Sequence, residues 1–189
     1  TMRGEAARAG GTLTLTPGEQ FVLSNDVTII GDVDGDNAAD ITLDAQLQSR
    51  VFLIEQGTAQ IESLTITGGR ADNGGGIRVE EGAALELNNS TLALNLANVN
   101  GGAIENRGTT TVSNSTLTQN AAFAFGGGFA NLGAAEFLNS TIHGNNAGDS
   151  GGGIFTFLEM TLTSTTVTGN AAANLGGGIN MAFSLRTIT

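Results

Sequence analysis

Hydrophobic residues recur along the chain at a nearly fixed spacing, each one shortly after a cluster of glycines. They are separated by 27, 25, 25 and 25 residues and comprise Ile77, Ile104, Phe129, Ile154 and Ile179. Asparagines recur with the same period, nine residues ahead of the last four of these positions, at Asn95, Asn120, Asn145 and Asn170. A fixed period of this length is the signature of an architecture in which similar units stack on one another. The chain is therefore predicted to be a stack of units of about 25 residues.

Within each unit, apolar and polar residues alternate over short segments. One unit has Leu85 and Leu87, then Leu92 and Leu94, beside Thr, Ser and Asn. Alternation at period two is typical of strands with one buried face, and no helical stripe is long enough to fill a unit. We therefore predict an all-β fold, a single-stranded parallel β-helix of about seven coils. Each coil should contribute about three short strands, and each strand should pair with its copy in the next coil about 4.8 Å away.

The recurring asparagines and glycines fit this architecture. Asparagines stacked at one position per coil can hydrogen-bond along the column and can satisfy backbone groups in turns. A second predicted column comprises Asn89, Asn114, Asn139 and Ser164. The glycine clusters let the backbone turn with positive φ at corners where a Cβ would clash.

Three repeat copies carry a resemblance to a known class of proteins. The segments GGGIRVEEGAALELNNSTLALN, GGAIENRGTTTVSNSTLTQN and GGGFANLGAAEFLNSTIHGN resemble the secreted right-handed parallel β-helix proteins of bacteria. That class includes the polymorphic-outer-membrane-type adhesin passengers, whose repeats carry GGA-I and F-x-x-N elements. The resemblance implies a right-handed coil, a short helix that caps the first coil, and a secreted or cell-surface setting.

The repeat pattern divides the chain into three parts. Residues 1–11 are predicted to be an N-terminal cap segment, with a short helix over 2–9. Residues 12–67 are predicted to form less regular first coils that include an acidic loop at 31–41, and residues 68–189 to form the regular coils. The last segment, FSLRTIT, has no polar cap, so an open edge at Leu185 and Ile188 would favour end-to-end or edge association.

Composition narrows the range of partners. The chain has no cysteine, which excludes disulfides and thiolate metal sites. Its net charge of -11 argues against binding to nucleic acid or to anionic membrane surfaces. No apolar run approaches the roughly 20 residues of a transmembrane helix, so direct membrane insertion is not expected.

One segment has the spacing of a metal-binding loop. In residues 31–41, GDVDGDNAADI, four aspartates occupy loop positions 1, 3, 5 and 9. Ca²⁺ takes six to eight hard oxygen ligands, and four carboxylates within nine residues would repel one another without a cation. The segment resembles the Ca²⁺ loops of integrin-type propeller blades and dockerins. We predict a structural Ca²⁺ site formed by Asp32, Asp34, Asp36, Asp40 and the carbonyl of Ala38, and the alternative is a solvated acidic loop.

Catalytic residues are not predicted. His143 is the only histidine and is expected on the exposed side of a strand, and the nearest acids in sequence, Glu136 and Asp149, do not fall on that strand. Glu80 and Glu105 could approach the roughly 5–9.5 Å separation of a glycosidase pair, but Arg78 and Arg107 lie nearby and indicate ion pairing.

Threonines form a further periodic set, at Thr65, Thr91, Thr116, Thr141 and Thr166. With a second threonine two residues on in three of these coils, they would present a flat Thr-x-Thr face able to order water. Such a face is typical of ice-binding β-helices, although threonine is also a common exposed strand residue.

These observations favour a non-catalytic structural or adhesin-like surface module, stabilised by Ca²⁺, whose partner is a cell-surface glycan or protein. Binding or processing of polysaccharide is the alternative, and ice binding is a third hypothesis.

Overall fold

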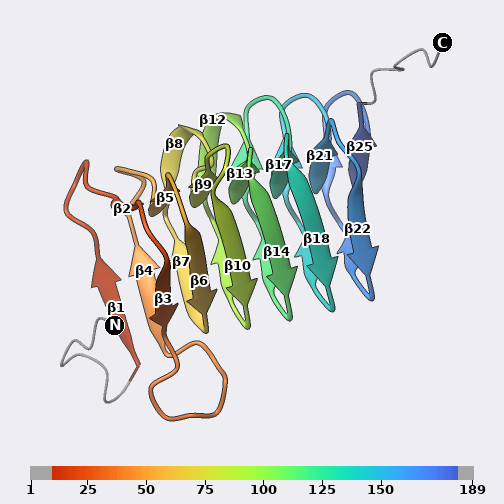
Figure 1. Cartoon of the computed structure of the whole chain (residues 1–189). Helices are drawn as coiled ribbons and strands as arrows, with labels where there is room; N and C mark the ends of the chain where they lie inside the picture. The colour runs from red at the N-terminus through yellow and green to blue at the C-terminus, as the bar shows by residue number, and fades with distance from the viewer. Residues whose placement is uncertain (1–9, 183–189) are drawn as a thin grey trace.

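The computed structural model describes residues 10–182, which form a parallel β-solenoid (Figure 1). The helix predicted over 2–9 and the segment 183–189 lie outside the described residues. Between strand β1 (Gly11–Thr14) and strand β23 (Thr166–Thr168) the described chain makes six full turns, and the two strands that follow begin a seventh. Residues 10–182 contain no helix, and therefore none that could cross a membrane. The predicted all-β stack of coils is confirmed.

Four sheets run along the solenoid, and every pairing between their strands is parallel. Sheet A contains β1, β4 (Ile41–Asp44), β7 (Leu64–Thr67), β11 (Thr91–Ala93), β15 (Thr116–Thr118), β19 (Thr141–His143) and β23. Sheet B contains β2 (Phe21–Leu23), β5 (Phe52–Ile54), β9 (Ile77–Val79), β13 (Ile104–Asn106), β17 (Phe129–Asn131), β21 (Ile154–Thr156) and β25 (Ile179–Met181). Sheet C contains β3 (Val27–Ile30), β6 (Thr58–Glu62), β10 (Ala84–Asn88), β14 (Thr109–Ser113), β18 (Ala134–Leu138) and β22 (Met160–Thr163). Sheet D contains β8 (Arg70–Asn73), β12 (Leu96–Asn100), β16 (Ala121–Ala122), β20 (Asn146–Ala147) and β24 (Ala171–Ala172).

The regular coils therefore carry four strands, one more than the period-two pattern indicates. The additional strand lies in sheet D and is only two residues long in β16, β20 and β24. Two residues are too few to show an alternation of apolar and polar positions, so hydrophobic patterning does not detect this strand.

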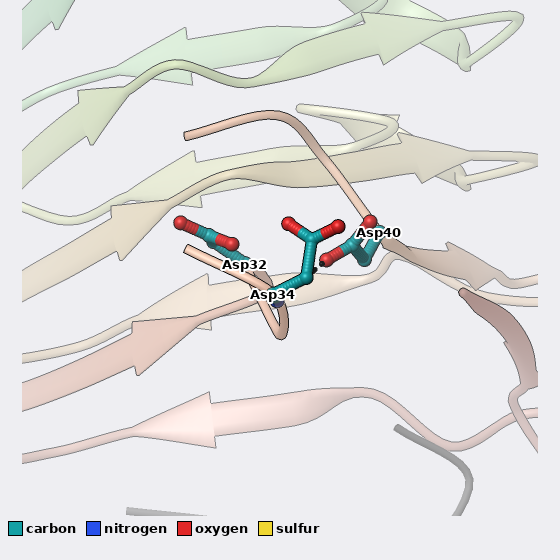
Figure 2. A group of neighbouring side chains, drawn as sticks. All are labelled: Asp32, Asp34 and Asp40. Carbon is teal, nitrogen blue, oxygen red and sulfur yellow. Dashed lines mark hydrogen bonds between the residues drawn. The ribbon is translucent and has the colours of Figure 1, made fainter. Parts of the chain in front are cut away.

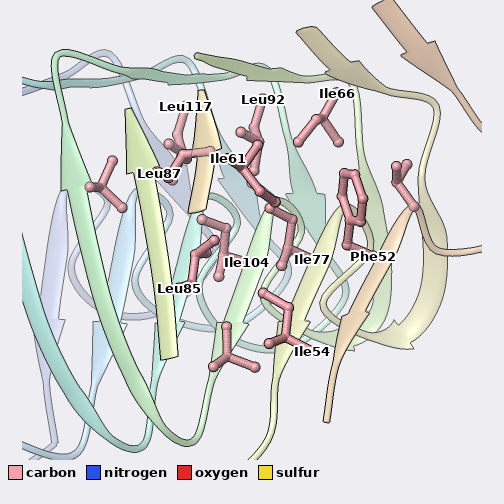
Figure 3. Close-up of a cluster of buried hydrophobic side chains, with 14 of the residues drawn as sticks. Phe52, Ile54, Ile61, Ile66, Ile77, Leu85, Leu87, Leu92, Ile104 and Leu117 are labelled. Atoms are coloured by element: carbon pink, nitrogen blue, oxygen red, sulfur yellow. The ribbon is translucent and has the colours of Figure 1, made fainter. Parts of the chain in front are cut away.

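The core is a continuous stack of inward-facing apolar side chains. Figure 3 shows Ile66, Leu92 and Leu117 of sheet A in a row, near Ile77 and Ile104 of sheet B, and all five are fully buried. Burying a side chain of this size stabilises a protein by about 1.5–3 kcal/mol relative to leaving it exposed. Parallel pairing holds equivalent residues in register, so the same inward positions fill the interior in successive coils.

The recurring asparagines form one inward column, as predicted. Asn95 Nδ2 donates to Asn120 Oδ1 at 3.0 Å, and Asn120 Nδ2 donates to Asn145 Oδ1 at 2.9 Å. Asn145 Nδ2 continues the series to Asn170 Oδ1 at 3.0 Å. The same Nδ2 groups also donate to backbone carbonyls of the preceding coil, so each amide connects its own coil to the coils on both sides. We call this set the asparagine column.

A further buried column was not anticipated. Asn106 Nδ2 donates to Asn131 Oδ1 at 2.8 Å, and Asn131 Nδ2 donates to Thr156 Oγ1 at 3.1 Å. Their Oδ1 atoms accept the backbone N–H of Gly108 and Gly133 at the start of the following turn. The 25-residue spacing of Asn106 and Asn131 is present in the sequence, but the next member is Thr156, so the column does not appear as a series of asparagines.

Candidate functional sites

The acidic loop leaves the solenoid between β3 and β4 and projects from the edge of the coils (Figure 1). Gly31 starts the excursion under the next coil, where an added Cβ would lie 2.2 Å from the carbonyl oxygen of Ser63. Ser63 Oγ donates to the carbonyl of Asn37 at 3.3 Å. The loop is therefore anchored at its base and by one side-chain contact, while its tip is exposed.

Three of the four aspartates come together. Carboxylate oxygens of Asp32, Asp34 and Asp40 lie within 4.8 Å of one another, and Figure 2 shows Asp34 between the other two. Asp36 lies outside this group, and its Oδ1 accepts the backbone N–H of Ala38 at 2.8 Å. We call Asp32, Asp34 and Asp40 the aspartate triad.

Backbone N–H groups of the loop donate hydrogen bonds to the aspartate triad. Asp32 accepts the N–H groups of Gly35 at 2.6 Å and Asn37 at 3.0 Å, and Asp40 Oδ2 accepts that of Val33 at 2.7 Å. These donors offset part of the repulsion between the carboxylates even without a cation. With one oxygen from each, three carboxylates supply fewer ligands than the six to eight oxygens of a Ca²⁺ site, so water or carbonyl groups would have to complete it.

The outer face of sheet A holds the threonine set and His143. The register Thr91↔Thr116↔Thr141 places these residues side by side in successive coils. His143 lies between Thr118 and Thr168 in the neighbouring column, exposed to solvent, as the sequence predicted.

A buried ionic cluster lies on the outer side of sheet B. Glu105 is 0% exposed, and its carboxylate lies 3.3 Å from Arg78 Nε in the preceding coil and 3.2 Å from Arg107 Nη2. Arg78 Nε also lies 2.8 Å from a carboxylate oxygen of Glu80. The predicted ion pairing of both glutamates is therefore present. Neither Glu105 Oε2 nor Arg78 Nε makes a well-aligned hydrogen bond, so their contact is mainly Coulombic.

Two arginines show how this cluster distributes charge. The hydrogen bond and the negative charge of Glu105 raise the pKa of Arg107. Burial, followed by repulsion from Arg78, lowers the pKa of Arg50. Arg50 Nε and Nη2 donate to the carbonyls of Gly74 and Asn73 at 3.0 and 2.8 Å, which links its coil to the next one.

Aromatic side chains gather further along the outer side of sheet B. Phe155, only 5% exposed, stacks on Phe125 at 4.5 Å and meets Phe157 edge-on at 4.9 Å between ring centroids. Phe157 is 46% exposed, so part of this aromatic group faces solvent.

Comparisons of the chain with protein-family models, curated proteins and solved structures found no match.

Proposed function

We propose that the chain is a non-catalytic structural module of a secreted or cell-surface protein, a stiff adhesin-like rod that spaces or displays binding groups. The observation that carries this proposal is the asparagine column. Asn95, Asn120 and Asn145 each hydrogen-bond the next coil through both the backbone N–H and Nδ2, in addition to the strand ladders.

These bonds run parallel to the long axis of the solenoid. In solenoids each unit contacts only its neighbours, so resistance to bending depends on the bonds between adjacent coils. Buried amide bonds in a water-poor interior are expensive to leave unmade, with a cost of about 1–3 kcal/mol for each orphaned group. A rod tied in this way keeps its ends at a fixed separation, which suits the display of a surface that meets a cell-surface glycan or protein.

The ionic cluster argues against the alternative of polysaccharide processing at Glu80 and Glu105. A glycosidase needs two carboxylates that reach the substrate from either side of the scissile bond. Glu105 has no exposed surface and faces two guanidinium groups. Its charge is therefore already compensated within the fold.

Ca²⁺ stabilisation is a separate part of this proposal, supported by the convergence of the aspartate triad. The ion would bridge Asp32, Asp34 and Asp40 and hold the excursion between β3 and β4 against the solenoid. Asp36 and the carbonyl of Ala38 would contribute only if the loop tip rearranged on binding.

Stiffness is tested with two spin labels on the outer face of sheet C. Thr28 and Thr161 are exposed and lie in one column, five coil steps or about 24 Å apart. The chain has no native cysteine, so Thr28→Cys with Thr161→Cys labels only these positions. Pulsed electron–electron resonance should give a narrow distance distribution, whereas a broad one would contradict the rod.

The non-catalytic part is tested by incubation with pectin, alginate and related acidic glycans. No new reducing ends or unsaturated products should form. Turnover that Glu105→Gln abolishes would establish the enzyme instead.

A further inference from the structure

The outer face of sheet A carries an unbroken column of threonines, one from each of its seven strands. The register of the strand pairs aligns Thr12, Thr42, Thr65, Thr91, Thr116, Thr141 and Thr166. All seven are exposed or half-buried. The sequence period reveals only the last five, because the first two steps span 30 and 23 residues, from Thr12 to Thr42 and from Thr42 to Thr65.

Duplication of a 25-residue unit does not account for this column. The first two coils depart from the period and still place threonine at this position. Sheet C, built from the same coils, shows a different result at the centre of its outer face, with Thr28, Gln60, Glu86, Thr111, Glu136 and Thr161 in register. Strand propensity would favour threonine on both faces equally. Of these two outer faces, only that of sheet A carries a uniform column.

A second column lies two residues further along the same face. Its members in chain order are Thr14, Asp44, Thr67, Ala93, Thr118, His143 and Thr168. Asp44 Oδ1 accepts the backbone N–H of Gln46 at 2.8 Å, so this carboxylate is engaged with its own turn. The face therefore presents two parallel rows in which hydroxyl and methyl groups predominate.

These rows have a spacing close to that of crystalline water. In a tetrahedral network with O···O distances of about 2.75 Å, second-neighbour oxygens lie about 4.5 Å apart. Neighbouring strands place successive threonines about 4.8 Å apart, within roughly 0.3 Å of that step. Threonine is β-branched and has few χ1 rotamers, so its hydroxyl and methyl are held in a restricted arrangement before any ligand binds. A rigid array loses little conformational entropy on binding.

We propose that the outer face of sheet A binds the surface of ice. The ligand is crystalline water, held by the hydroxyls of the threonine column and by its methyl groups packing against the ordered layer. Each contact is weak, and affinity comes from seven equally spaced contacts made by one rigid face. This activity is independent of the rod proposal, because the spin-label distance on sheet C does not involve sheet A.

The experiment grows ice slowly from a dilute solution of the chain and measures the fraction incorporated into the ice. Crystal microscopy measures the gap between melting and freezing temperatures on the same samples. Thr116→Lys and Thr141→Lys place a bulky charge within the threonine column. Thr111→Lys is the matched control, because Thr111 is equally half-buried, faces outward on sheet C, and belongs to the same coil as Thr116.

The parent chain and Thr111→Lys should enter the ice and show a freezing gap, and both column variants should lose these properties. Circular dichroism melting establishes that each variant is folded. Exclusion of the parent chain from ice, or equal loss in Thr111→Lys and Thr116→Lys, overturns the proposal.

Discussion

Asn145 Oδ1 accepts two hydrogen bonds from Asn120 in the preceding coil, one from the backbone N–H and one from Nδ2, both at 2.9 Å. The second Nδ2 proton of Asn120 goes to the carbonyl of Leu92, also at 2.9 Å. Asn120 is 1% exposed, so none of these groups has water as an alternative partner. A single side chain therefore joins its own coil to both neighbouring coils, three in all, at the corner between sheets A and D.

Replacing Asn120 with leucine should lower the free energy of unfolding by about 1–3 kcal/mol, because Leu92 O and Asn145 Oδ1 would lose buried donors. Denaturant unfolding measures the change. Asn98→Ala is the control: Asn98 is exposed, and within residues 10–182 its side chain donates only to Asp72, so its effect should stay within about 0.5 kcal/mol. Equal effects of the two changes would contradict a structural role for the asparagine column.

The glycine corners allow a sharper comparison. An added Cβ at Gly153 would lie 2.6 Å from the carbonyl oxygen of Gly178, whereas at Gly178, in the last described coil, the nearest atom of residues 10–182 is Val167 Cγ1 at 3.7 Å. Gly153→Ala should therefore destabilise by about 1–3 kcal/mol or more, since backbone must shift. Gly178→Ala occupies the same corner one coil later and should be nearly neutral. Thermal unfolding of both variants checks the difference, and a neutral Gly153→Ala would mean that the coils pack less closely.

The ionic cluster should behave as a coupled unit. Arg78→Met removes one of two guanidinium groups from Glu105, and we expect a loss somewhat below the roughly 3–5 kcal/mol typical of a fully broken buried pair. Adding Glu105→Leu removes the stranded charge and should restore much of the stability, because Arg107, partly exposed, can turn to water. A double-mutant cycle in urea measures the coupling. Additive effects would show that Arg78 and Glu105 do not interact.

Ca²⁺ at 100 times its dissociation constant should stabilise the folded chain by about 2.7 kcal/mol if it binds the aspartate triad of the native state alone. The melting temperature should then fall in EDTA and recover with Ca²⁺, and Mg²⁺ should substitute poorly because it demands near-ideal octahedral geometry.

Asp34→Asn and Asp36→Asn separate the triad from the rest of the acidic loop. Asp34 belongs to the triad and Asp36 does not, so Asp34→Asn should abolish the Ca²⁺ response while Asp36→Asn largely keeps it. If calorimetry detects no binding heat and Asp34→Asn melts like the parent chain, the Ca²⁺ prediction is wrong and the acidic loop is a solvated turn.

Sequence alone determined that the regular coils are a parallel stack of short strands, although it missed the short strand of sheet D. A fixed period and an alternation of apolar and polar residues are enough to predict this stack. In a parallel stack, equivalent positions have the same environment in every coil, so the same kind of residue recurs there. The buried positions Ile77, Ile104 and Phe129, and the inward asparagine column, follow from that repetition and lie where they were expected.

The sites were less predictable, because they depend on how side chains orient rather than on where they lie along the chain. Spacing placed Asp32, Asp34, Asp36 and Asp40 in one loop, but the path of the backbone brought only three of them together and turned Asp36 toward Ala38. Positions within a loop show only that residues are close in sequence. The direction of each carboxylate depends on the backbone N–H groups from which it accepts hydrogen bonds.

The first coils also show the difference between what the sequence period predicts and what the tertiary structure decides. Thr12 and Thr42 join the threonine column only through strand pairing, since the residues between them do not follow the period. Likewise, the burial of Glu105 on the outer side of sheet B depends on Arg78 and Arg107 folding over it. Periodicity in the sequence determined which features repeat from coil to coil. The tertiary structure decided what the irregular loops and the long side chains contact, because those contacts depend on packing between segments that share no sequence pattern.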